Sequence, residues 1–186
     1  MPFGWTSSEF DDDGTLQDAI DKAYSKKVLM LAAASNSGVR SRHAYPSSSP
    51  EVMCIHSANA DGWLSGFSPA PASFFGMYLA TLGEAVESAG MREDFEARSG
   101  TSVATAIAKG ICGFLIMYAR AHLPEEARRL RRKQAMEKLL TRGAEVEREY
   151  TPWNVYDYVQ LRLTSHNLFR RDMESVKMEI KKVLRG

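Results

Sequence analysis

A continuous apolar run from Val28 to Ala34 (VLMLAAA) constrains the fold more than any other feature of the chain. The run is too short for a typical helix and opens on a β-branched residue, which is the pattern of a strand covered on both faces. Strands buried on both faces occur in parallel sheets flanked by helices. We therefore predict an α/β fold with a mostly parallel sheet.

The rest of the chain supplies further strands and helices. Leu16, Ile20 and Tyr24 share one face of a short helix that should stop near residues 25–27. Residues 102–118 are apolar on nearly every face, which predicts a helix buried in the middle of the domain. The other expected elements are strands at 52–56, 64–68 and 77–82, one amphipathic helix over 124–143, and a final helix over 173–184.

Composition indicates one globular, nearly neutral unit, with 24 Lys and Arg against 23 Asp and Glu in 186 residues. Ile111–Tyr118, the longest apolar run, is far below the roughly 18 residues of a membrane span, so we expect no membrane contact. No signal-peptide pattern follows Met1, which favours a cytoplasmic location. Cys54 and Cys112 lie in apolar stretches and predict reduced core thiols, with a disulfide as the alternative.

Cationic residues gather between Arg128 and Lys133. Such a cluster could bind the phosphate backbone of a nucleic acid. The favoured interpretation is a solvated helix face, because Leu130, Met136 and Leu139 form an apolar stripe in the same segment. Nucleic acid is therefore the less favoured partner.

Two short segments could carry chemistry. In Ser99–Thr105 (SGTSVAT), a small turning segment delivers Ser102 to the first turn of the long apolar helix. Unpaired amides there favour developing negative charge, although a serine at this place is also an ordinary N-cap. Asn36 follows the buried strand at the end where parallel sheets build their sites, although alone it reads as a turn residue.

Taken together, the two segments resemble the subtilisin-like serine peptidases (peptidase S8), whose GTSxAxP block carries the catalytic serine and whose AAxxN block supplies an oxyanion-hole asparagine. Further segments resemble that family in collinear order over roughly residues 1 to 120. These are the cleft strand at Met1–Trp5, the YPA segment at Ala44–Pro46, the SxFS segment at Gly66–Pro69 and the APG strand at Ala80–Val86.

The resemblance implies that Ser102 is the nucleophile and that Asn36 donates a hydrogen bond to the oxyanion. It implies a polypeptide substrate and neither a metal nor a cofactor. It also implies a set of substrate-binding residues: Pro2, Phe3, Gly4, Ala33, Ala34, Ser35 and Ala44. Three positions depart from the family pattern, since Ala106 replaces a proline, Ser35 a glycine and Pro2 a common serine.

A subtilisin-type triad also needs an Asp and a His upstream of the asparagine strand. His43, His56, His122 and His166 lack the family's context and are interpreted as surface or strand-end histidines. We therefore expect residues 1–122 to be the C-terminal half of the peptidase domain, a three-layer α/β/α fold without its N-terminal strands. Residues 123–186 would form a helical extension.

Two functions follow as hypotheses. The first is a serine endopeptidase that is inactive as this chain alone and that pairs with the missing N-terminal half. The second is a non-catalytic remnant that binds a peptide or a protein partner.

Overall fold

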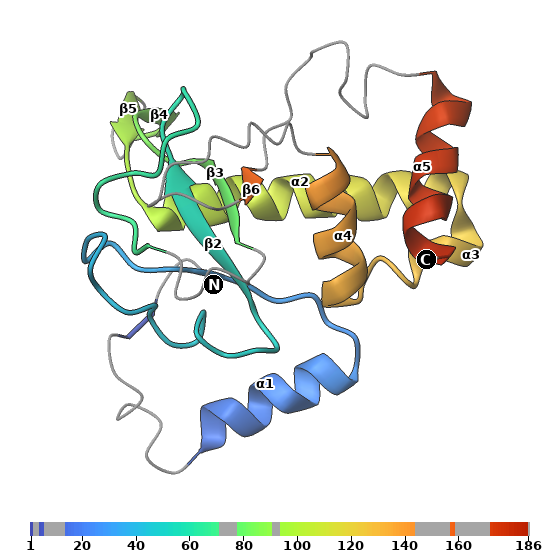
Figure 1. Cartoon of the computed structure of the whole chain (residues 1–186), viewed down its shortest axis with the longest axis horizontal. Helices are drawn as coiled ribbons and strands as arrows, with labels where there is room; N and C mark the ends of the chain where they lie inside the picture. Colours follow the sequence, from blue (N-terminus) through green and yellow to red (C-terminus); the bar gives the residue numbers. More distant parts are fainter. Residues whose placement is uncertain are drawn as a thin grey trace.

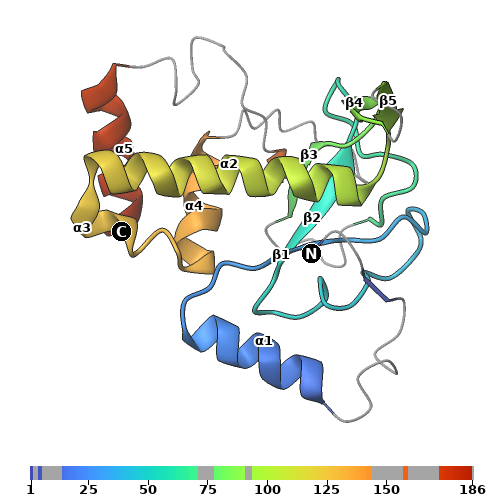
Figure 2. The same ribbon diagram turned by 180° about the vertical axis from the view of Figure 1, so that it is seen from behind.

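The structure, a computed structural model, describes residues 1, 4–5, 14–70, 78–90, 94–143, 157–158 and 172–185. Its centre is a parallel sheet in the order β1-β2-β3-β6, with β1 at Leu31–Ala33, β2 at Met53–Ala58, β3 at Leu79–Leu82 and β6 at Asp157–Tyr158 (β2, β3 and β6 in Figure 1, β1 in Figure 2). The predicted α/β fold with a parallel sheet is confirmed. The first strand is shorter than predicted.

Helix α2 (Thr101–His122) runs across one face of this sheet (Figure 2). Alternate strand residues such as Leu31, Met53 and Ile55 pack against it in the main core. On the other face, Ile20 of α1 (Thr15–Ser25) packs with Ala32 and Val52. The sheet is thus covered on both faces, as the apolar strand pattern predicts.

The prediction that α2 is buried all round is wrong. One side packs on the sheet, whereas Phe114 and Met117 on the other side are 49% and 69% exposed. By length and composition this helix could cross a membrane, because its most apolar window has a mean hydropathy of 1.6. Its packing against β1, β2 and β3 identifies it instead as the core helix of the domain.

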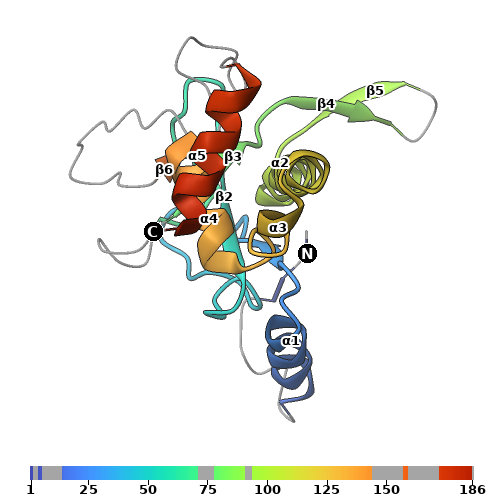
Figure 3. The same ribbon diagram turned by 90° about the vertical axis from the view of Figure 1, so that its right-hand side faces the viewer.

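The predicted helix over 124–143 is broken into α3 (Pro124–Ala127) and α4 (Lys133–Gly143). The turn between them holds Arg128, Arg129, Arg131 and Arg132, and like charges three or four residues apart destabilise a helix. Leu130 still points inward, fully buried, and Met136 and Leu139 follow it into the core. With α5 (Met173–Arg185), these helices share the core of α2 and the sheet (Figure 3).

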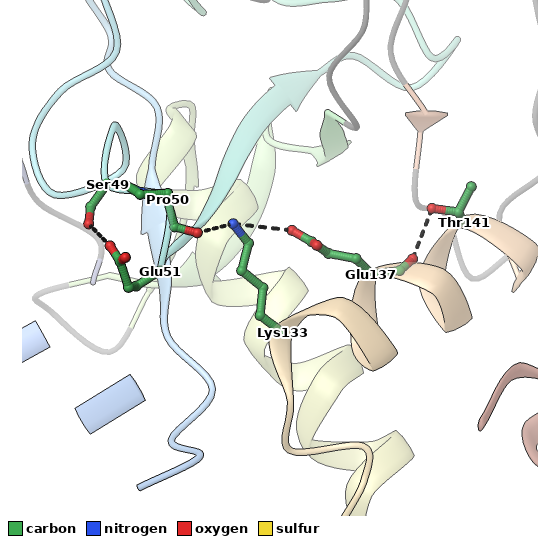
Figure 4. Close-up of polar contacts among 6 residues, drawn as sticks. All are labelled: Ser49, Pro50, Glu51, Lys133, Glu137 and Thr141. Carbon is green, nitrogen blue, oxygen red and sulfur yellow. Dashed lines mark hydrogen bonds and ion pairs between the residues drawn. The ribbon is translucent and has the colours of Figure 1, made fainter. Parts of the chain in front are cut away.

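Lys133, the last residue of the basic cluster, ties α4 to the loop before β2 (Figure 4). Its ammonium donates to the Pro50 carbonyl at 2.5 Å and lies 3.6 Å from the Glu137 carboxylate. Burial raises the pKa of Glu137, and the Lys133 charge opposes that shift. Part of the predicted solvated face is therefore a structural contact between two elements.

Two further differences concern strands. The predicted strand at 64–68 is not formed: only Leu64 pairs, in a single bridge with Ala58, and residues 66–67 form a turn. An antiparallel hairpin of β4 (Val86–Ala89) and β5 (Phe95–Arg98) was not predicted. Its residues are mostly exposed, so they lack the alternation of apolar and polar side chains that signals a half-buried strand.

Candidate functional site

Asn36 is positioned by the end of β1. The strand's ladder continues through Ala34, whose N–H donates to the Ile55 carbonyl at 3.0 Å, and the chain then turns sharply. Ser35 makes this turn with a φ of +150°, a value that L-residues rarely adopt and that glycine adopts freely. The turn leaves Asn36 exposed at the carboxyl edge of the sheet.

Ser102 occupies the first turn of α2, immediately after the turn at Gly100. The N–H of Gly100 donates to the Gly83 carbonyl at 2.8 Å, which anchors the helix start to the end of β3. Gly100 has a φ of +157°. A Cβ added there would lie 3.1 Å from Ser102 Oγ and 3.3 Å from Asn36 Nδ2, so both side chains lie over Gly100.

Thr101 fixes the direction of the Asn36 amide. Its backbone N–H and its hydroxyl are 2.8 and 3.0 Å from Asn36 Oδ1. The N–H can only donate, so the amide oxygen must face Thr101. The Nδ2 group, which only donates, is thereby left over Gly100 on the side of Ser102.

The arrangement can stabilise an anion beside Ser102. The Asn36 amide is one donor, and the Ser102 N–H, at the positive end of the α2 dipole, is the second. Among the described residues, no hydrogen bond uses the Ser102 N–H. Donors fixed in place before reaction are the usual means of stabilising the oxyanion of acyl transfer.

Within the described residues, no hydrogen bond joins Ser102 Oγ to a histidine or a carboxylate. His122 is the last residue of α2, about 30 Å from Ser102 at a rise of about 1.5 Å per residue. His56 lies inside β2 and is fully buried, so its interpretation as a surface or strand-end residue is wrong. His166 lies outside the described residues.

Five of the seven predicted substrate-binding residues lie in the described part of the chain, close to one another. Gly4, Ala34 and Ala44 lie together, because Ala44 N–H donates to the Ala34 carbonyl at 2.6 Å and a Cβ on Gly4 would lie 2.8 Å from Ala44 Cβ. Ala33 and Ser35 flank Ala34 along the chain. Pro2 and Phe3 lie outside the described residues.

Sequence reasoning missed two supports of the site. Thr101 orients Asn36, and its hydroxyl also donates to the Ser35 carbonyl at 3.1 Å. Gly83 allows β3 and α2 to meet, since a Cβ there would lie 2.4 Å from Ser57 Oγ and 2.9 Å from the Gly100 carbonyl oxygen. A threonine beside the predicted nucleophile and a glycine after a buried strand were the available signals.

Comparison with known proteins supports one class. The model of the subtilase family matches residues 3–156. The structure of the patellamide maturation protease PatA is similar to all of this chain and covers 62% of its own chain, with a TM-score of 0.69 and 21% identity. The prenylagaramide maturation protease PagA is similar over 77% of this chain and 50% of its own, with a TM-score of 0.63 and 23% identity.

A mutant of the PatA protease domain, S218A, matches 97% of this chain and 56% of its own, with a TM-score of 0.65 and 20% identity. No curated protein sequence gives a significant match. The chain spans between half and two thirds of the length of these three solved structures. The fold is that of the subtilisin-like proteases.

The family follows from the extent of the match. Most of the chain fits the family model, and the parallel sheet and central helix agree with the solved structures. This chain belongs to the subtilase family of serine peptidases.

Proposed function

We propose that this chain supplies the nucleophile and the oxyanion hole of a serine endopeptidase. Ser102 Oγ attacks the carbonyl carbon of a peptide bond, and the carbonyl oxygen becomes an oxyanion that accepts hydrogen bonds from Asn36 Nδ2 and the Ser102 N–H. Collapse of this intermediate breaks the C–N bond and releases the amine, which takes the serine proton from the triad base, and water then hydrolyses the acyl-enzyme to the carboxylic acid and free Ser102. One observation carries the proposal: Thr101 holds the Asn36 oxygen and leaves its amide donor beside Ser102.

Attack also requires a base to take the Ser102 proton. We propose that the Asp and His of the triad come from chain outside the described residues, in an N-terminal half of the peptidase domain. In subtilisin itself, loss of the histidine costs about 10⁶ in turnover. This chain alone is therefore expected to be inactive.

A non-catalytic remnant is the second candidate. It is favoured by the lack of a base bonded to Ser102 among the described residues, by Ala106 in place of the family's proline, and by Ser35 at the strained turn. In this case the chain would bind a peptide or a partner without cleaving it.

The remaining assignments belong to the same proposal. The substrate is a polypeptide lying along Pro2–Gly4, Ala33–Ser35 and Ala44, and neither a membrane nor a nucleic acid is a partner. We place the protein in the cytoplasm. We propose the boundary between the peptidase half and the helical extension at residues 122 and 123.

The test begins with the coding sequence upstream of Met1. The proposal expects in-frame DxG and HGT blocks, and the chain that includes them is called the extended protein below. A fluorophosphonate probe should label Ser102 in the extended protein and not in its Ser102→Ala variant. The chain alone should give no labelling above that control.

Each alternative has a distinct result. An upstream region without these blocks, together with an unlabelled Ser102, would leave the non-catalytic remnant. Strong labelling of Ser102 in the chain alone would show that a base is already present. It would overturn the expectation that this chain is inactive alone and the second candidate function, a non-catalytic remnant.

A further inference from the structure

Three metal-binding side chains converge on the sheet face opposite α2. Cys54 and His56 are two residues apart in β2, so both point to the face that α2 does not cover. His43 approaches from the loop before β2. One ligand atom from each side chain, a thiol sulfur and two ring nitrogens, lies within 4.8 Å of the other two.

The spacing suits a tetrahedral cation. Cys54 Sγ and His56 Nε2 are 3.7 Å apart. Zinc at about 2.3 Å from sulfur and about 2.0 Å from nitrogen would separate these ligands by roughly 3.5 Å. Cys54 and His56 could therefore bind such an ion with almost no movement of their side chains. The His43 ring would have to move slightly closer to the other two ligand atoms.

The His56 ring is already oriented as a ligand. Its Nδ1 lies 3.0 Å from the Pro69 carbonyl oxygen, which can only accept, so Nδ1 carries the proton. The lone pair is then on Nε2, the atom that faces Cys54. Metal-bound histidines commonly make this hydrogen bond with their second nitrogen.

His43 contributes a nitrogen with no evident structural role. Its Nε2 is buried and has no hydrogen-bond partner among the described residues. A buried polar atom left unpaired costs about 1–3 kcal/mol. Its ring lies edge to face with that of His56, with centroids 5.0 Å apart, so the His43 ring packs directly against this cluster.

We propose that His43, Cys54 and His56 bind a divalent cation of the zinc class, with the fourth position open to water. On binding, Cys54 loses its thiol proton to solvent and forms a sulfur–metal bond, while both imidazoles bind as neutral ligands. The cation would pin the loop that carries His43 and Ala44 to β2. The site stands on its own geometry and does not depend on the peptidase assignment.

The test uses the tag-free chain after treatment with a chelator, titrated with Co²⁺ and then with Zn²⁺. One equivalent of Co²⁺ should give the absorption of a thiolate–cobalt bond, and Zn²⁺ should abolish it. His43→Ala and Cys54→Ser should lower Zn²⁺ affinity by more than about 100-fold, beyond the loss caused by a supporting residue. Cys112→Ser, which changes the other free cysteine, should bind as the unchanged chain does.

Folding is checked separately, because the cluster reaches into the core at the fully buried His56 and substitutions in it could unfold the chain. Zn²⁺ should raise the Tm of the unchanged chain and of Cys112→Ser, and leave that of the folded His43→Ala and Cys54→Ser variants unchanged. Absence of a thiolate–cobalt band, or Zn²⁺ affinity that is unaffected by both variants, would overturn the proposal.

Discussion

Two polar clusters lie at the sheet, and they differ in which hydrogen-bonding atoms are left without a partner. The edge cluster is Asn36, Thr101 and Ser102, and the cluster beneath β2 is His43, Cys54 and His56. At the carboxyl edge, Thr101 satisfies the oxygen of Asn36 and leaves a donor beside Ser102. Beneath β2, one ring nitrogen each of His43 and His56 lies within 4.8 Å of Cys54 Sγ, and His43 Nε2 is unpaired among the described residues. The first cluster presents donors and suits an anion, whereas the second presents lone pairs and suits a cation.

The difference arises from local backbone geometry. The edge cluster lies at a helix start, where the Ser102 N–H has no partner among the described residues and can donate. The cluster beneath β2 lies on a strand whose own amides are used by the ladder, so only side chains remain to interact. The two clusters should therefore respond differently to pH, to packing changes and to loss of a hydroxyl.

Acidification should affect the cluster beneath β2 most. Burial, helped by the charge of His43, lowers the pKa of His56 to about 4 from 6.5. The unfolded chain then takes up the proton first, so stability is present above pH 6.5 and is lost as the pH falls toward 4. The full loss is about 3 kcal/mol at about 1.4 kcal/mol per pKa unit.

Urea unfolding with a chelator present, between pH 7 and pH 4, measures this loss. His122→Gln is the control, because that residue lies at the end of α2, and it should follow the unchanged chain. His56→Gln should flatten the curve. A parallel loss in all three proteins would contradict the assignment to His56.

A methyl group added at Gly83, where β3 meets the start of α2, should lower the stability of the chain. Gly83→Ala places a Cβ 2.4 Å from Ser57 Oγ and 2.9 Å from the Gly100 carbonyl oxygen, and overpacking of this kind costs about 1–3 kcal/mol. Gly110→Ala in α2 meets nothing within 4 Å and should stabilise the chain by up to about 1 kcal/mol. Equal unfolding free energies for the two variants would mean that β3 and α2 do not meet as described.

The smallest effect comes from a hydroxyl. Thr101→Val removes the hydroxyl's hydrogen bonds to Asn36 and Ser35 and keeps the one from the Thr101 N–H to Asn36 Oδ1, and Thr105→Val removes one to the Thr101 carbonyl. Each should cost about 1 kcal/mol of stability. Only Thr101→Val should also slow fluorophosphonate labelling of the extended protein, by about tenfold. Equal labelling rates would show that the Thr101 hydroxyl takes no part in orienting Asn36.

Much of the fold was predictable because its signals are local. The run Val28–Ala34 indicated a strand covered on both faces, and the spacing of Leu16, Ile20 and Tyr24 indicated α1. The break at Arg128–Arg132 was missed because the apolar stripe continues through it on both sides. The exposed side of α2 was missed because sequence shows that a face is apolar and not whether another element covers it.

The candidate site, like the fold, was predicted only in part from the sequence. Ser102 and Asn36 were found through motif order, but the part played by Thr101 depends on a contact between residues 65 positions apart. The metal-binding cluster was missed, and we predicted no metal. Cys54 and His56 share a strand face, yet nothing in the sequence shows that the loop returns His43 to them.

The most direct test of the account is the rate at which a fluorophosphonate labels Ser102 in the extended protein when Asn36 is changed. Asn36→Ala should slow labelling by about 10²–10³, the loss in turnover known for the corresponding change in subtilisin. Asn59→Ala, which alters an asparagine in the turn after β2, should label at the unchanged rate. An unchanged rate for Asn36→Ala would contradict its assignment to the oxyanion hole.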